Sequence, residues 1–270
     1  MISVTTSTKV VLAARFLGGV SGGGFLVYAP MFISEVAEDS VRGTLASAPE
    51  EQKRMSPIKM LFVSPSSRRA FLVVITVISM QVSMGMVPVQ VYAKTVFTQT
   101  DPASADMYTV IFALVLMCGS FVTAAIADKA GRRVLIIASS VAVCVFMATL
   151  GYLLQSRVAP PWVTVLVIMC YCFSFMFGAG AVPYVLLAEV FVPEVQGLAS
   201  MLIIEWVWFL NFAIIAIFPI MNNFLGIYGS FYVFSCCGMA NAIISYFIVP
   251  ETKGLSNEQI QEVFLGRKNN

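Results

Sequence analysis

Two segments of the chain place acidic and basic residues where an ion pair would form. The run from Asp128 to Arg133 (Asp-Lys-Ala-Gly-Arg-Arg) holds one acid, Gly131 and two arginines, and Glu189 ends a long apolar stretch. A guanidinium pairs with a carboxylate through a two-pronged hydrogen bond, and it also binds the carbonyl end of a helix. The residues therefore predict that Arg132 or Arg133 reaches Glu189. The competing interpretation is a plain topology signal, which needs only basic residues and not this order.

The sequence lacks the usual catalytic and metal-binding residue patterns. There is no histidine, so the usual general base and the Ser-His triad are absent. The six cysteines all lie in apolar runs, and neither Cys170-x-Cys172 nor Cys236-Cys237 has the spacing of zinc ligands. Such thiols behave as small apolar side chains. We expect no enzyme activity, no disulfide framework, no metal and no cofactor.

Polar side chains interrupt two of the long apolar runs. Gln81, Ser83 and Gln90 lie in one of them. Glu205, Trp208 and Asn211 lie in another of these runs. Trp208 and Asn211 are three residues apart, so they share one face of a helix. Polar groups in such runs either face a cavity or hydrogen-bond to neighbouring helices, and the pattern leaves both readings open. Glu205 is a functional candidate unless it sits at a shallow, wetted depth.

Composition says where these side chains reside. Hydrophobic residues make up 59% of the 270 residues and charged residues only 11%, with a mean hydropathy of +0.88. Soluble domains carry about 25% charged residues, so this is an integral membrane protein. A spanning helix needs about 20 mostly apolar residues. Seven stretches qualify, and all are expected to be helices because a lone strand cannot span lipid: 10–33, 70–96, 107–127, 134–154, 162–188, 198–221 and 230–249.

The basic residues predict an orientation for these spans. Of the 16 lysines and arginines, all but Lys9, Arg15, Lys94 and Arg157 fall in alternate intervening segments. The positive-inside rule places that larger set in the cytoplasm. The N-terminus is then outside and the C-terminus is cytoplasmic.

The segment 178–197 has an unusual composition for a membrane helix. Gly178, Gly180 and Pro183 loosen its first half, and Glu189 and Pro193 end its second half at the membrane surface. Helix-weakening residues are tolerated in lipid where neighbouring helices or a water-filled cavity satisfy the freed backbone groups. The segment is either a moving part that faces a pathway or a place where small residues let two helices pack closely.

Six short motifs are spread in order over nearly the whole chain. They are Pro30 to Glu35 with Arg42-Gly43, Gln81 and Ser83 with Tyr92 and Phe97, Asp128 with Gly131 to Arg133, Val182 to Phe191, Trp208-x-x-Asn211-Phe212 with Phe218-Pro219, and Pro250-Glu251-Thr252-Lys253-Gly254. In this order they resemble the sugar porter family of the major facilitator superfamily, and most of all its facilitated trehalose transporter-like members.

The resemblance implies an all-α, polytopic membrane protein of about seven transmembrane helices. Residues 1–34 resemble transmembrane helix four of the family, 35–69 form a cytoplasmic loop, 70–250 form the six-helix C-terminal half of a major facilitator fold, and 251–270 form a cytoplasmic tail. The other N-terminal helices of the family have no counterpart here. The seam lies near Ser47-Ala48-Pro49.

The resemblance also assigns roles to individual residues. Gln81, Tyr184, Trp208 and Asn211 match sugar-contacting positions, whereas Met86, Met176 and Val207 stand where polar family residues would be. A gating network at the cytoplasmic face is implied for Glu35, Arg42, Asp128, Gly131, Arg132, Arg133, Glu189 and Glu251.

The function implied is facilitated diffusion of a sugar, a hexose or trehalose, by alternating access. Uniport is the default, with Glu205 the one embedded group that stands out as a proton carrier. The alternative is a truncated, transport-inactive family member that is inert or binds a full-length relative. A seven-helix receptor would fit the orientation but not the motifs. The expected partners are a small-molecule sugar, the lipid bilayer and, under the alternative, a homologous transporter chain. No nucleic acid is expected, and the expected location is the plasma membrane.

Overall fold

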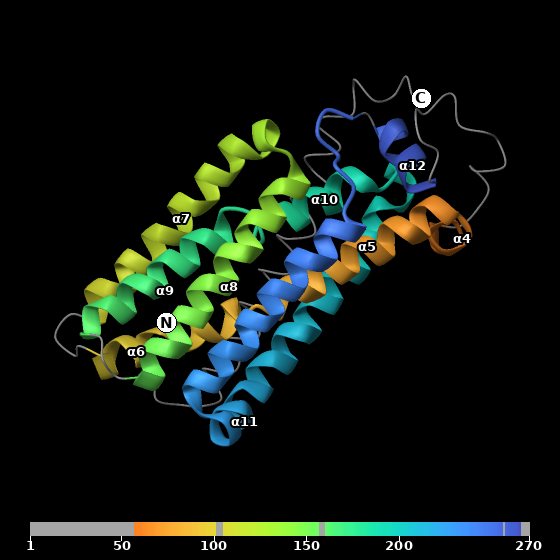
Figure 1. The fold of residues 1–270 in the computed structure, drawn as a ribbon. Coiled ribbons are helices and arrows are strands. Elements are labelled where there is room, and N and C mark those ends of the chain that lie inside the picture. The colour runs from red at the N-terminus through yellow and green to blue at the C-terminus, as the bar shows by residue number, and fades with distance from the viewer. Residues whose placement is uncertain (1–56, 101–104, 157–159, 256, 266–270) are drawn as a thin grey trace, which may run out of the picture. The chain divides into compact units, whose positions relative to one another are not determined.

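The computed structural model describes residues 57–100, 105–156, 160–255 and 257–265. Within these ranges every regular element is a helix, as the sequence predicts. The helices are α4 (Pro57–Val63), α5 (Pro65–Val82), α6 (Met86–Thr100), α7 (Ala105–Ala130), α8 (Arg132–Ser156), α9 (Pro161–Met176), α10 (Val182–Val190), α11 (Pro193–Ile248) and α12 (Asn257–Leu265) (Figure 1). The first expected span, 10–33, lies outside the described residues, as do Glu35 and Arg42.

Several of the described helices are long and apolar enough to span a membrane. Four stretches are long and apolar enough to cross a bilayer: Pro65–Tyr92, Ala105–Ala127, Arg132–Ser156 and Val195–Ile248. The last of these holds both of the final two expected spans. Its helix, α11, reverses at Gly226, whose φ of 72° is open to glycine but rarely to other residues, so α11 consists of two arms. A shorter apolar helix, Trp162–Met176, lies in the sequence between the stretches Arg132–Ser156 and Val195–Ile248.

Two expected spans are broken rather than continuous. The span 70–96 is divided into α5 and α6 at residues 83–85, where Gly85 has a φ of 83°. The span 162–188 is divided into α9 and α10 at residues 177–181, at the glycines that the sequence singles out. Helical structure also begins earlier than expected, because α4 and the start of α5 fall within 35–69. A proline opens each, at positions where its missing N–H costs nothing.

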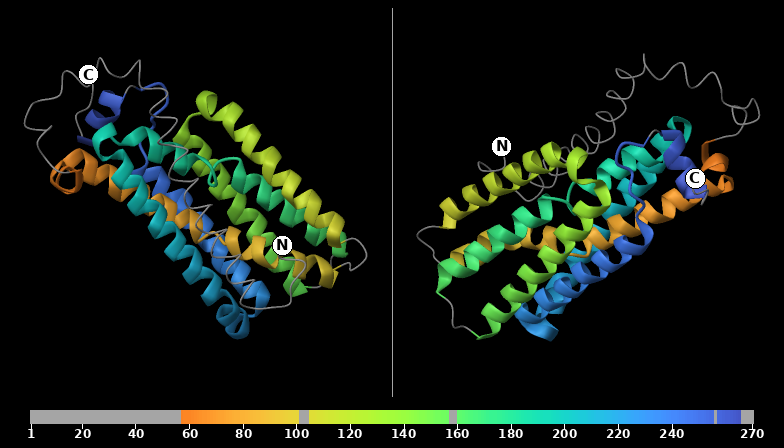
Figure 2. Two further views of the ribbon diagram at one scale, coloured as in Figure 1. Left: turned by 180° about the vertical axis from the view of Figure 1, so that it is seen from behind. Right: turned by 45° about the horizontal axis from the view of Figure 1, so that its top comes forward.

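The described residues, all from Pro57 onward, pack as one compact unit. The two arms of α11 lie along α8 and α5, which the views of Figures 1 and 2 both show. One buried cluster joins α5, α10 and α11 through residues such as Ile78, Leu186 and Ile203. A second joins α8 and α9 through residues such as Met147 and Tyr171. The broken span α9–α10 is therefore held by packing on both sides of its break.

The break at 177–181 lies unusually close to the backbone of α8. A Cβ added at Gly178 would lie 2.4 Å from the Leu135 carbonyl oxygen and 2.6 Å from Ser139 Oγ. The Leu135 carbonyl is part of the helix backbone and cannot move aside, and Ser139 Oγ is held by hydrogen bonds to the Ile136 carbonyl and the Ala179 N–H. Gly178 is thus required for the contact between the break and α8.

We expect Gly178→Ala to destabilise the protein by about 1–3 kcal/mol, the usual cost of overpacking a tight contact. The matched control is Gly197→Ala in α11, where nothing lies within 4 Å of the added Cβ. That change should be neutral or stabilise by about 0.5–1 kcal/mol, since alanine is the better helix former. Thermal unfolding in nanodiscs measures both. Equal effects of the two substitutions would contradict the close contact.

Candidate functional site

The break between α9 and α10 frees backbone groups inside a membrane protein, and side chains of three other helices bind them. The Ala179 N–H donates to Ser139 Oγ of α8 at 2.7 Å. The Gly180 carbonyl accepts from Gln81 Nε2 of α5 at 3.0 Å. The last carbonyl of α9 accepts from Thr123 Oγ1 of α7 at 2.6 Å. Because an unpaired backbone group in hydrocarbon costs several kcal/mol, these bonds are what permit the break.

Gln81 binds the break through its amide nitrogen alone, and its amide oxygen is not used there. The side chain is 5% exposed, its Nε2 is used by Gly180, and its Oε1 is buried with no hydrogen-bond partner among the described residues. A buried carbonyl oxygen left without a donor costs about 1–3 kcal/mol. Such an atom calls for an explanation, and a ligand that donates a hydrogen bond is one.

The other three sugar-contact candidates lie on α10 and α11. Asn211 repeats the situation of Gln81, since its Oδ1 is buried without a partner among the described residues. Tyr184, in the first turn of α10, is 40% exposed and Trp208 is 55% exposed. No hydrogen bond or ring contact recorded for the described residues joins the four side chains directly. Gln81 is tied instead to Gly180, four residues before Tyr184. Gln81 and Asn211 each offer one acceptor oxygen, and Tyr184 and Trp208 each offer a partly exposed ring.

The predicted ion pair is present at one end of α10. Arg132 Nη2 donates to Glu189 Oε1 at 2.7 Å, with the two side chains 11% and 26% exposed. Arg132 Nη1 also donates to the Ala127 carbonyl in the last turn of α7, at 3.2 Å. The second oxygen of Glu189 accepts from Thr252 Oγ1 at 3.1 Å. This charged cluster therefore ties together the end of α7, the start of α8, the end of α10 and the segment after α11.

Glu251 is held by the start of α8 rather than by a basic side chain. Its two carboxylate oxygens accept from the backbone N–H groups of Arg132 at 2.9 Å and of Arg133 at 3.3 Å. A helix N-terminus presents free N–H groups and a positive dipole end, so it binds a carboxylate well. Gly131 makes room for this contact: its φ is 92°, and an added Cβ would lie 2.7 Å from Glu251 Oε2.

Arg133, another member of the expected network, binds the end of α11. The Arg133 guanidinium donates to the Tyr246 carbonyl and lies over the Tyr246 ring, 5.2 Å from its centre. Lys253 Nζ donates to the Lys129 carbonyl at 2.5 Å. Asp128 lies in the last turn of α7, and its side chain is outside the description.

Glu205, the candidate proton carrier on α11, is exposed. Within the described ranges, no three cysteine, aspartate or glutamate side chains are grouped so as to hold a metal ion.

Several residues that position the site were not singled out by the sequence analysis. Ser139 and Thr123 are ordinary small polar residues of membrane helices, and only the glycines of the neighbouring break hinted that they would have backbone groups to bind. Gln261 of α12 bridges two other elements. It donates from Nε2 to the Val190 carbonyl at 2.5 Å and accepts from the Ser66 hydroxyl. Helix α12, in the expected tail, is thus docked onto α5 and α10.

Sequence comparison gives the chain a family. The model of the "Sugar (and other) transporter" family matches residues 1–50 and 46–264. The facilitated trehalose transporter Tret1 of Apis mellifera ligustica is 28% identical over 60% of this chain and 33% of its own length. The sugar transporter ERD6-like 1 of Arabidopsis thaliana is 28% identical over 85% of this chain and 49% of its own length. The chain thus spans between about a third and a half of the length of these relatives.

Structure comparison agrees. The proton:xylose symporter XylE, solved with 6-bromo-6-deoxy-D-glucose bound, superposes with a TM-score of 0.67 and 26% identity over 72% of this chain and 42% of XylE. A XylE variant with two introduced tryptophans gives a TM-score of 0.68 at 25% identity. A family match over most of the chain, a major facilitator fold and several apolar helices point the same way. This multi-pass membrane protein, which is not an enzyme, belongs to the sugar (and other) transporter family of the major facilitator superfamily.

Proposed function

We propose that the chain binds a sugar and moves it across the membrane by facilitated diffusion with alternating access. The observation that carries this proposal is the pair of buried amide oxygens, Gln81 Oε1 and Asn211 Oδ1, that lack donors among the described residues. Both belong to helices of a sugar transporter fold. Sugar hydroxyls are donors of the right kind, because each can give one hydrogen bond to an amide oxygen.

The exposed rings complete the proposed site. Sugars present apolar C–H faces as well as hydroxyls, and ligand sites combine apolar walls with a few placed polar groups. Trp208 offers an accessible indole on the same helix as Asn211, one turn away, and Tyr184 adds a phenol on α10. We assign the four residues as the sugar contacts. The name of the Apis relative favours trehalose as substrate, and the glucose derivative bound to XylE favours a hexose.

The charged cluster supports a role in the conformational change. Alternating access in this superfamily rocks one helix bundle against another around a site near the bilayer midplane. We assign Arg132, Glu189 and Glu251 as a latch that stabilises one of the two states, with Gly131 providing its geometry. Arg133, Asp128, Glu35 and Arg42 belong to the same proposed network. The basic residues that flank the spans favour a cytoplasmic position for this latch. The plasma membrane is the location that we propose for the protein.

Sugar binding gives the sharpest test of the proposed site. Asn211→Ala should weaken binding by about 1–3 kcal/mol, because sugar hydroxyls lose their acceptor in a dry pocket. The purified full chain is titrated with trehalose, glucose and xylose, and the quenching of tryptophan fluorescence is followed. The control is Gln90→Ala, which removes an amide from the exposed side of α6. If Asn211→Ala and Gln90→Ala both bind as the unchanged chain does, the sugar site is not at Asn211.

The latch is tested by a double-mutant cycle between Arg132→Gln and Glu189→Gln. The pair is partly exposed, so its coupling energy should be about 1 kcal/mol in thermal or denaturant unfolding. The control cycle pairs Arg133→Gln with Glu189→Gln, because the Arg133 guanidinium binds Tyr246 instead. That second cycle should give a coupling near zero. Coupling of equal size in both cycles would show a diffuse electrostatic effect in place of a specific pair.

A further inference from the structure

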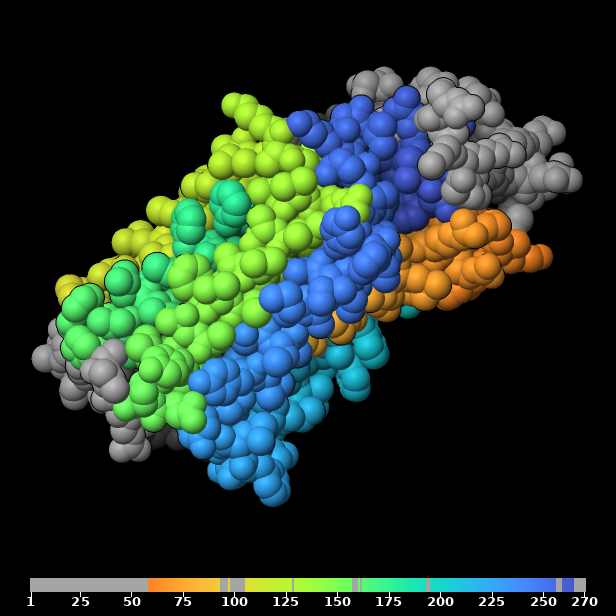
Figure 3. Space-filling model, in the orientation of Figure 1, coloured from red at the N-terminus to blue at the C-terminus, as the bar shows by residue number. Residues whose placement is uncertain are grey.

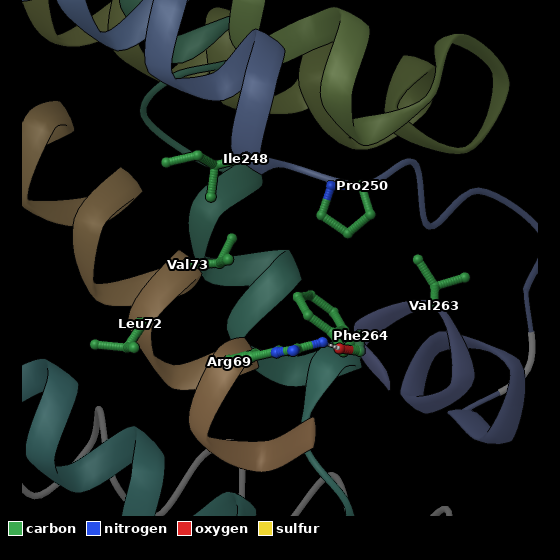
Figure 4. Close-up of a pocket in the computed structure, with 7 residues that line it drawn as sticks. All are labelled: Arg69, Leu72, Val73, Ile248, Pro250, Val263 and Phe264. Carbon is green, nitrogen blue, oxygen red and sulfur yellow. Dashed lines mark hydrogen bonds between the residues drawn. The ribbon is translucent and has the colours of Figure 1, made fainter. Parts of the chain in front are cut away.

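A cavity opens at the end of the bundle where α5 begins and the second arm of α11 finishes. Its volume is about 310 Å³, at the lower end of the range for small-ligand sites. Arg69, Leu72 and Val73 line it from α5, Ile248 from α11 and Phe264 from α12 (Figure 4). The surface view shows the same end, with α12 seated against the start of α5 (Figure 3).

The position of this cavity along the spans sets its surroundings. The stretches Pro65–Tyr92 and Val195–Ile248 are two of those that can cross a bilayer, and the cavity lies at the first turns of one and the last residue of the other. The ends of membrane spans lie where hydrocarbon meets the headgroups. Leu72 and Ile248 are 56% and 43% exposed, so their apolar surfaces face outward at that depth. The cavity therefore opens toward lipid on its apolar side.

Arg69 is the one charged residue among those that line the cavity. In Figure 4 its guanidinium crosses the cavity floor and binds the Phe264 carbonyl, with Nη1 donating at 3.1 Å. A guanidinium has five N–H donors, so most of them stay available. Among the described residues, no carboxylate is recorded within ion-pair distance of Arg69. A cation with unused donors beside an apolar groove suits an anionic amphiphile, because arginine binds phosphate in a two-pronged geometry.

We propose that this cavity is a specific site for one anionic phospholipid. A fatty-acyl chain lies along Leu72, Val73 and Ile248, and the lipid phosphate binds Arg69. A sugar or a peptide fits less well, because apart from Arg69 the lining side chains are all apolar and offer no hydrogen bonds. Since α12 forms one wall through Phe264, the bound lipid also strengthens the docking of α12 on α5. This site is separate from the proposed sugar contacts and does not depend on transport.

The test compares Arg69→Gln with Arg68→Gln, the neighbouring exposed arginine that does not line the cavity. The full chain is placed in nanodiscs of phosphatidylcholine with and without phosphatidylglycerol. Phosphatidylglycerol should raise the melting temperature of the unchanged chain and of Arg68→Gln, and should not raise that of Arg69→Gln. Native mass spectrometry should show retained anionic lipid falling about fivefold or more in Arg69→Gln alone. Equal losses in the two variants would overturn the site, because they would mark general surface attraction.

Two further experiments distinguish a bound lipid from a free anion at Arg69. Val263→Trp fills the cavity from α12 while leaving Arg69 and the Phe264 carbonyl in place. It should abolish lipid retention and the shift in melting temperature, and unchanged retention would contradict an acyl chain in the cavity. Inorganic phosphate added to phosphatidylcholine nanodiscs should give no shift. A shift equal to that of phosphatidylglycerol would assign Arg69 to a free anion and overturn the lipid proposal.

Discussion

The backbone between α9 and α10 must find hydrogen bonds without water, and most of the site follows from how it does so. Lipid supplies no donors or acceptors, so a helix can break there only where other helices supply them. Gly178 lets α8 come close, Ser139 of α8 then reaches the Ala179 N–H, and Gln81 of α5 reaches the Gly180 carbonyl. The same bond, made by the amide nitrogen of Gln81, leaves the amide oxygen buried and without a partner among the described residues. A structural necessity thus creates an acceptor that a ligand can use.

The break and the charged cluster are the two ends of one short helix. α10 has nine residues, so it is about 13 Å long. At its first turn is Tyr184, and at its last is Glu189, which is bound by Arg132 and Thr252. Its buried face, including Leu186 and Val190, packs into the core shared with α5 and α11. α10 is anchored by an ion pair at one end and is separated from α9 by the glycine break at the other, so it can move as a short rigid unit. Under the proposed function, this movement connects events at the sugar contacts with the latch.

Much of this could be read from the sequence, because hydrophobic length and helix-weakening residues act locally. Apolar runs predicted membrane helices, Gly178 and Gly180 predicted a loosened span, and the order of Asp128, Arg132 and Glu189 predicted the ion pair. Contacts between distant segments could not be read in this way. That Glu251 binds backbone N–H groups of α8 depends on how the segment after α11 folds back.

A motif position also does not reveal that one side chain has two roles. Gln81 matches a sugar-contact position, yet in the structure half of its amide holds the Gly180 carbonyl. Met86 and Val207 stand where the family has polar residues, and both are buried among apolar side chains, at 4% and 5% exposure. They add no donor or acceptor, so a sugar would depend on fewer polar contacts here, chiefly Gln81 and Asn211. This makes the two amide oxygens the critical part of the account.

The most direct test is uptake of labelled sugar by liposomes that contain the purified chain. We expect uptake that saturates and that a protonophore does not abolish. Asn211→Ala should reduce this uptake, and Gln90→Ala should leave it unchanged. Uptake no greater than in protein-free liposomes, for trehalose, glucose and xylose alike, would contradict facilitated sugar transport by this chain.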